Sequence, residues 1–169
     1  PMLGQTPLRG CVMNRSLVAW SLLLVFASAA SANMLADPSF ESGPASWTFT
    51  GSAGPTNWTL RSGDTGVVVR GWESSPASFY QEVATTATGA YTFGIWVLKE
   101  ANHISTTNRL TLSWLDSGGS PVQPDAVADF VQVPRDGLWH YVFVTGVCTS
   151  TSLAKIRATV FSAWNSPAD

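Results

Sequence analysis

The chain has 169 residues, of which 45% are hydrophobic and only 12% charged, and its formal net charge is −2. This length is typical of one domain, and the low charge argues against intrinsic disorder and against an electrostatic partner such as nucleic acid.

The N-terminal residues have the pattern of an export signal. Arg15 precedes an apolar run over 17–26, and small residues follow, with an A-x-A cleavage site that ends at Ala32. The apolar run is shorter than the roughly 20 residues that a membrane span requires. We therefore expect residues 13–32 to be a signal peptide, and the mature chain to be secreted without a membrane span. Residues 1–12 are either an upstream leader or an extended n-region. One cysteine, Cys148, lies beyond this signal, so the mature chain is expected to fold without an internal disulfide.

Apolar and polar residues alternate with a period of two over most of the remaining chain, and no window shows a helical stripe. Stretches rich in Gly, Pro and Ser, 51–55 among them, separate the alternating runs. This pattern predicts an all-β fold, an antiparallel β-sandwich or jelly roll, rather than βαβ units. The predicted strands cover 67–69, 79–83, 91–99, 110–115, 139–144 and 156–161.

The alternation also assigns the side chains of each strand to two faces. In the run over 91–99, one face carries Tyr91, Phe93, Ile95 and Val97, which we expect in the core. The opposite face carries Trp96 beside Gly94. Three further tryptophans are expected in the core: Trp47, Trp114 and Trp139.

Three motifs follow one another along the chain. They are Asn33-Met34-Leu35-Ala36-Asp37-Pro38-Ser39-Phe40-Glu41-Ser42-Gly43 before Trp47, then Ala90-Tyr91-Thr92-Phe93-Gly94-Ile95-Trp96-Val97, then Leu138-Trp139-His140-Tyr141. Their order and spacing resemble those of secreted carbohydrate-binding modules of the family 4, 9 and 22 type, which have a galactose-binding-like jelly-roll fold. The resemblance covers most of residues 33–162. It implies a noncatalytic module that binds a polysaccharide or oligosaccharide.

Modules of this type normally close with one more apolar strand, and the present sequence stops at Asp169, before that strand would begin. We therefore expect residues 33–169 to be a carbohydrate-binding-like module that is incomplete at its C-terminus, with its last strand missing. This interpretation makes the chain part of a longer secreted protein with covalently linked further domains. A strand left without its neighbour would expose an edge.

The resemblance also implies a structural calcium ion that joins the first and last strands. Glu41 would be a carboxylate ligand, with backbone carbonyls near 62–65 and an aspartate from the absent strand, since Ca²⁺ takes six to eight oxygen ligands. The alternative is that Glu41 caps a turn.

Sugar recognition needs an exposed aromatic ring on a rigid sheet face, flanked by polar side chains. Trp96 is a candidate platform, with packing on the second face as the alternative. The resemblance adds Arg70 and Trp72 as a pair that binds the ligand. The alternative is that Trp72 is an ordinary exposed aromatic residue of a loop. Three residues are candidates for hydrogen bonds to a sugar, or else are solvated strand residues: Tyr80, Glu82 and Ser113.

The sequence has no G-x-S-x-G, H-E-x-x-H or phosphate-loop motif. His103 and His140 stand in separate segments, and nothing in the pattern brings two carboxylates to the spacing that glycoside hydrolysis needs. We therefore expect no enzyme, although the module can be accessory to a glycoside hydrolase. The alternative function is a structural or interaction β-sandwich domain of a cell-surface or virion protein, with no sugar affinity.

Overall fold

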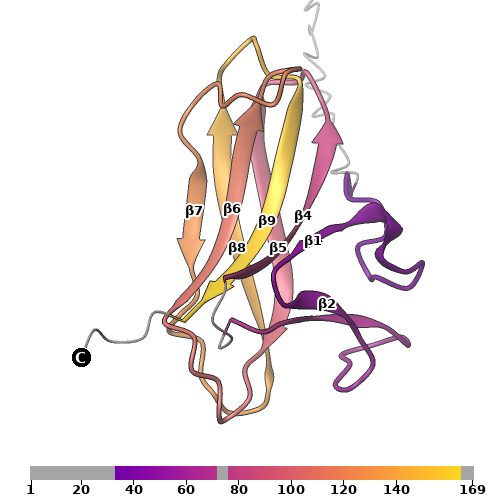
Figure 1. Ribbon diagram of the computed structural model, residues 1–169. Helices are drawn as coiled ribbons and strands as arrows, with labels where there is room; N and C mark the ends of the chain where they lie inside the picture. The colour runs from indigo at the N-terminus through magenta and orange to yellow at the C-terminus, as the bar shows by residue number, and fades with distance from the viewer. Residues whose placement is uncertain (1–32, 72–75, 165–169) are drawn as a thin grey trace, which may run out of the picture. The chain divides into compact units, whose positions relative to one another are not determined.

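Nine strands and one short 3-10 helix make up the part of the chain that the computed structural model describes, residues 33–71 and 76–164 (Figure 1). The compact unit begins at Asn33, the residue after the predicted cleavage site. The predicted leader and signal peptide, Trp72 and residues 165–169 lie outside the described residues, so the expectations about them stay predictions. Within the described part, no helix is long and apolar enough to cross a membrane.

The strands pair antiparallel throughout. One sheet has five strands in the order β1-β4-β9-β6-β7, and two further sheets of two strands each are β2-β3 and β5-β8. The elements are η1 (Pro44–Ser46), β1 (Thr48–Thr50), β2 (Ala53–Thr56), β3 (Gly66–Val69), β4 (Ala77–Ala84), β5 (Gly89–Leu98), β6 (Thr107–Leu115), β7 (Ala126–Asp129), β8 (Trp139–Cys148) and β9 (Lys155–Ala163). The prediction of an all-β antiparallel sandwich is confirmed.

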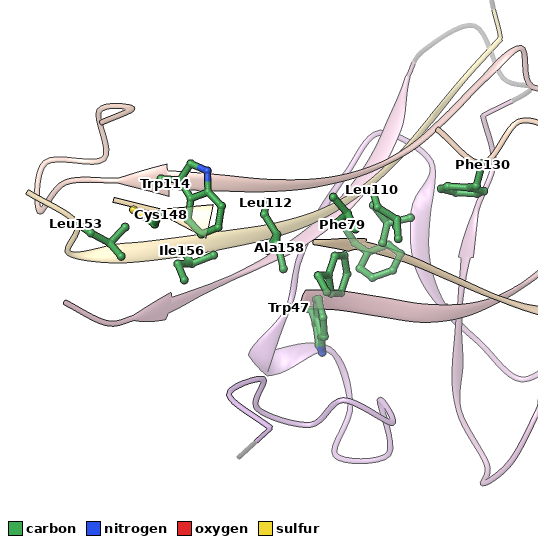
Figure 2. Close-up of a cluster of buried hydrophobic side chains, with 13 residues drawn as sticks. Trp47, Phe79, Leu110, Leu112, Trp114, Phe130, Cys148, Leu153, Ile156 and Ala158 are labelled. Atoms are coloured by element: carbon green, nitrogen blue, oxygen red, sulfur yellow. The ribbon is translucent and has the colours of Figure 1, made fainter. Parts of the chain in front are cut away.

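The five-stranded sheet packs against β5 and β8 through one continuous hydrophobic core. Its inward row includes Leu112 and Trp114 of β6, and the facing layer contributes Phe93 and Val144. The Trp114 ring is buried and lies 5.7 Å from the ring of Tyr91 on β5. Figure 2 shows the core side chains spread along the sheet, from Leu153, Cys148 and Trp114 toward one end to Phe130 at the other. The predicted core face of β5 is therefore confirmed, since Tyr91, Phe93, Ile95 and Val97 all belong to this core or pack against it.

The N-terminal motif closes one side of this core. Phe40, Trp47 and Phe79 form an aromatic cluster with ring centroids 5.0 to 5.7 Å apart. Gln81, buried in β4, accepts a hydrogen bond from the Ala36 amide at 2.7 Å and donates to the Ala36 carbonyl at 2.9 Å. A buried amide with its partners satisfied fixes the path of the segment that precedes β1.

Three strands escaped the sequence prediction, β1, β2 and β7, because three or four residues are too few to show a period of two. The interpretation of 51–55 as a turn was wrong, since β2 occupies most of it. The Arg70 amide donates a hydrogen bond to the Ser52 carbonyl at 3.0 Å, so Ser52 and Arg70 are a hydrogen-bonded pair. Along an antiparallel ladder, such pairs alternate with non-hydrogen-bonded pairs. The Pro55–Val67 pair of this register is therefore a non-hydrogen-bonded one, in which proline has no ladder bond to lose.

The assignment of Trp139 to the core was also wrong. Trp47 and Trp114 are buried as expected, but Trp139 is half-buried. It follows the phase of Tyr141 and Phe143 on the outer face of β8, because alternate residues of a strand share a face.

Candidate functional site

A row of exposed aromatic side chains lies on the outer face of β5 and β8, the face that points away from the core. The exposed fractions are 44% for Trp96 of β5 and 53% and 57% for Tyr141 and Phe143 of β8. We call these three residues the aromatic face. Trp96 was predicted as a platform, whereas the sequence analysis did not nominate Tyr141 and Phe143. In the sequence, Tyr141 and Phe143 alternate with His140, Val142 and Val144, and this alternation indicates that the two rings share the face opposite Val144.

The register of the two strands brings these rings together. Trp96 lies directly opposite Tyr141, and their ring centroids are 5.3 Å apart with an interplanar angle of 53°. Tyr141 and Phe143 are 6.2 Å apart and only 26° from parallel. The Tyr141 hydroxyl lies over the backbone of Gly94, where a Cβ would meet it at 2.1 Å. The absence of a side chain at Gly94 thus gives the Tyr141 ring space to lie along the sheet.

Polar groups border the aromatic face. The Arg61 guanidinium lies 3.9 Å from the centre of the Trp96 ring, a cation–π contact that covers part of that ring. On the same face of β5 and β8, the Thr92 and Thr145 hydroxyls are hydrogen-bonded to each other at 2.9 Å. Guanidinium and hydroxyl groups of this kind can donate to the oxygens of a polar ligand that lies on the rings.

A groove of about 530 Å³ runs beside the aromatic face, between β3 and β5. Trp96 and Trp58 are among its lining residues. Trp58 is 71% exposed, and the Arg70 guanidinium lies 5.0 Å from its ring centre. Arg70 therefore does lie near an aromatic ring, but among the described residues the ring is that of Trp58, which the sequence analysis missed. The predicted partner, Trp72, lies outside the described residues.

The remaining predicted site residues lie on the opposite side of the sandwich. Tyr80, Glu82 and Ser113 point outward from the five-stranded sheet, where Glu82, Arg157 and Ser113 form one cross-strand row. The six candidates are thus not brought together: Trp96 lines the groove, Arg70 lies beside Trp58 of its lining, and the other three described ones occupy the far face.

Glu82 is held in an ionic cluster. Lys155 donates to its Oε2 at 2.6 Å and Arg157 donates to its Oε1 at 2.9 Å, while the Arg157 guanidinium lies 4.7 Å from the Tyr80 ring centre. The hydrogen bond from Lys155 first, and that from Arg157 next, lower the pKa of Glu82. The carboxylate is therefore ionised at neutral pH and paired within the sheet, which favours a cross-strand structural role over general acid catalysis.

Glu41 lies against the 62–65 loop, as the resemblance implied, but its carboxylate accepts backbone N–H groups. Asp64 donates its amide to Oε2 at 2.9 Å and Thr65 donates to Oε1 at 3.4 Å. No group of three His, Cys, Asp or Glu side chains able to hold a metal is found in the described part of the chain. In this arrangement Glu41 caps the 62–65 turn, the alternative that the sequence analysis gave. The calcium ion stays a prediction.

The side chains of the two histidines contact an aspartate and an asparagine. His140 is within 3.0 Å of Asp136, and its hydrogen bond is the main cause that lowers the pKa of that aspartate. His103 contacts Asn108 at 3.3 Å, and burial lowers its pKa. Neither contact is with a serine or cysteine that it would activate.

Comparison with known proteins gives the fold. No family model matches the sequence, and no curated protein matches it. Among solved structures, a family 16 carbohydrate-binding module is similar with a TM-score of 0.59 and 16% identity, over 79% of this chain and 92% of that one. The CBM22-1–CBM22-2 tandem domain of Xyn10C from Paenibacillus barcinonensis is similar with a TM-score of 0.50 and 13% identity, over 81% of this chain and 47% of that one.

The enzymatically active domain of tailspike protein 4 of bacteriophage CBA120 is similar with a TM-score of 0.58 and 15% identity. That match covers 79% of this chain and only 19% of the tailspike chain. The chain therefore has the β-sandwich fold of carbohydrate-binding modules, as the sequence motifs led us to expect.

Proposed function

We propose that this protein is a noncatalytic module that binds a polysaccharide or oligosaccharide on its aromatic face. The observation that carries the proposal is the pair of exposed, nearly parallel rings of Tyr141 and Phe143, with Trp96 beside them. A pyranose ring has weakly apolar C–H faces and many hydroxyls. Flat rings on a rigid sheet, bordered by donors, suit both features.

The exposure of the three rings of the aromatic face supports a binding role for them over ordinary surface packing. Three large aromatic residues in contact with one another form a contiguous apolar patch, and such patches on soluble domains mark interaction sites. The opposite face of the sandwich instead carries paired charges, Glu82 with Lys155 and Arg157. The two faces are thus built differently: in the described part of the chain, exposed rings in mutual contact lie on the β5–β8 face and paired charges on the other.

The fold supports the same proposal at the level of class, since its structural neighbours include carbohydrate-binding modules. We further propose that the module acts outside the cell, exported by residues 13–32. The signal pattern of the sequence supports this setting.

Affinity gel electrophoresis tests the function directly. The native protein is run through gels that contain xylan, β-glucan, mannan or soluble cellulose derivatives, beside a non-binding marker protein. We expect retardation in at least one glycan and its loss in Tyr141→Ala. Equal mobility of the native protein in every gel and in the glycan-free control would contradict the proposal.

One observation favours a second candidate, a structural module of a virion protein: the similarity to a bacteriophage tailspike chain. The same gels separate the two, because a purely structural module is not retarded by any glycan.

A further inference from the structure

Two arginines beside the groove between β3 and β5 lie on tryptophan rings. The Arg61 guanidinium is 3.9 Å from the centre of the Trp96 ring, and the Arg70 guanidinium is 5.0 Å from the centre of the Trp58 ring. Both tryptophans line the groove, and so does Arg61. The groove is therefore bordered by two guanidinium groups, each in contact with its own indole ring.

No carboxylate of the described part of the chain neutralises these two cations. The arginines that form ion pairs there are Arg109 and Arg157, and both belong to the five-stranded sheet. Arg61 is exposed and Arg70 is half-buried. The whole chain has a formal net charge of −2, so two unneutralised cations beside one groove are a local feature. Such a feature attracts an anionic group to this part of the surface.

The contact with a tryptophan leaves the hydrogen-bond donors of each guanidinium available. A cation–π contact uses the face of the aromatic ring, whereas the five N–H donors of a guanidinium lie in its plane and point outward from its edge. These donors form a fork that matches two oxygens of one anionic group. The ring also restricts the arginine side chain before a ligand arrives, so less conformational freedom is lost on binding.

The alternation of the strands directs both arginines to the side of the aromatic face. Val67 and Val69 of β3 pack against the core. Because alternate residues of a strand share a face, Arg70 points away from the core, as Trp96 does from β5. Arg61, from the loop between β2 and β3, reaches the Trp96 ring. The two cations thus extend the aromatic face across the groove toward β3.

The other charged side chains near the groove are engaged or lie further along it. The Lys99 ammonium is buried and donates to the Phe130 carbonyl at 2.9 Å. The Glu41 carboxylate accepts the amides of the 62–65 loop. Glu100 lines the groove from the segment that follows β5. The charge that lies on a ring of the aromatic face is that of Arg61.

We propose that the glycan bound on the aromatic face is acidic, and that Arg61 and Arg70 bind its anionic substituents. This inference rests on the proposed function, because it assigns a substrate class to the same site. A sugar unit that lies on the rings places a carboxylate or sulfate at its edge, where the Arg61 fork donates two N–H groups to its oxygens. Trp58 and Arg70 form a second pair of the same kind, for a further unit of the same glycan chain.

The test compares polymers that differ in charge alone. Polygalacturonate is paired with its methyl-esterified form, and carrageenan with its desulfated form, so the first pair tests a carboxylate and the second a sulfate. Affinities are measured by affinity electrophoresis and by titration calorimetry. We expect the native protein to bind one charged polymer at least about tenfold more tightly than its uncharged counterpart. This preference should decline as the salt concentration rises from about 0.05 M to about 0.5 M.

Arg61→Gln should lower the affinity for the charged polymer by about tenfold, and Arg70→Gln should lower it in the same direction. The readout is the ratio of the affinities for the charged and uncharged polymers, because a displaced Trp96 ring would weaken both alike. Arg109→Gln is the matched control: it removes the same charge from an ion pair of the five-stranded sheet and should keep the native ratio. Thermal unfolding verifies that each variant is folded.

The outcomes separate this inference from the proposed function. If the native protein binds charged and uncharged polymers equally and Tyr141→Ala loses both, the inference is wrong and the aromatic face still binds glycan. An equal loss in Arg61→Gln and Arg109→Gln would mean that overall charge attracts the polymer, and would overturn the inference too. Binding of the charged polymer that Tyr141→Ala keeps in full would place the anion site away from the aromatic face, with the same consequence. No binding of any glycan, neutral or charged, would overturn the proposed function itself.

Discussion

The phenol of Tyr141 lies over the backbone of Gly94, its diagonal neighbour on the adjacent strand. A Cβ added to Gly94 would come within 2.1 Å of the Tyr141 hydroxyl and 2.6 Å of the ring carbon that carries it. The position of the exposed Tyr141 ring therefore depends on Gly94, although Gly94 has no side chain that could itself contact a ligand.

Replacing Gly94 by alanine should therefore impair binding more than stability. The new methyl group lifts the Tyr141 ring away from the sheet, and a shift of this size breaks the alignment with Phe143. We expect glycan affinity to fall by about tenfold, while the cost to folding stays small, since alanine in a strand costs less entropy than glycine. Affinity electrophoresis and thermal unfolding measure the two effects.

Gly54→Ala is the matched control for this experiment. Gly54 also lies in a strand, and a Cβ there would meet nothing within 4 Å. It should bind glycan as the native protein does. If Gly94→Ala and Gly54→Ala bind equally well, Tyr141 does not hold a sugar in the position seen here.

Phe143→Ala should weaken glycan binding by at least about tenfold, the size of effect expected for a central aromatic contact. Its ring is 57% exposed, so its loss should change the free energy of unfolding by less than about 0.5 kcal/mol. Tyr80→Ala, on the opposite face, is the control. Binding lost in Tyr80→Ala and kept in Phe143→Ala would move the site to the five-stranded sheet.

The ionic cluster of Glu82 predicts a pH dependence at acid pH. The hydrogen bonds from Lys155 and Arg157 lower the pKa of Glu82 in the folded protein, so the contribution is complete above the unfolded value of about 4.3 and is lost as the pH falls through the lower folded value. The side chains are partly exposed, which limits the effect to about 1 kcal/mol or less. Urea unfolding between pH 2 and 6 should show a shallower acid loss in Glu82→Gln. Parallel profiles would mean that the cluster adds no stability.

Lys99 should matter more than its charge suggests. Its buried ammonium donates to the Phe130 carbonyl at 2.9 Å and to the Val131 carbonyl at 2.8 Å, tying the end of β5 to the segment after β7. Lys99→Met keeps the chain length but leaves both carbonyls unpaired, which should cost about 2–4 kcal/mol in chemical denaturation. Lys155→Met, at a partly exposed surface pair, should cost less than about 1 kcal/mol. A Lys99→Met protein as stable as the native one would show that water replaces the ammonium.

The sequence analysis predicted the long strands well because each has eight to ten residues and alternates cleanly, as β4 and β5 do. It missed β2, where Gly54 and Pro55 are typical of turns. Only the pairing with β3 shows that Pro55 sits where no ladder hydrogen bond is made.

For the candidate site, alternation placed Trp96 on an outer face but did not show which outer face. Tyr80 and Glu82 have the same parity within β4, yet β4 belongs to the other sheet. Face parity is a local property of a strand, whereas the sheet that the strand joins depends on long-range pairing. Trp139 was misplaced for a different reason: its phase with apolar neighbours indicated the core, but the neighbours in that phase, Tyr141 and Phe143, are exposed on the outer face.

Pro55 makes the two borders of the β2–β3 hairpin chemically unequal. Its ring nitrogen, which carries no hydrogen, faces the border of β2 that lies away from β3. A neighbouring molecule that approached there would find a gap in the donor row, which discourages fibrous self-association. At the opposite edge of the hairpin, the N–H and C=O groups of Val67 and Val69 in β3 face away from β2 and can form hydrogen bonds with another strand. The two edges of the hairpin therefore differ in their capacity to pair with another strand.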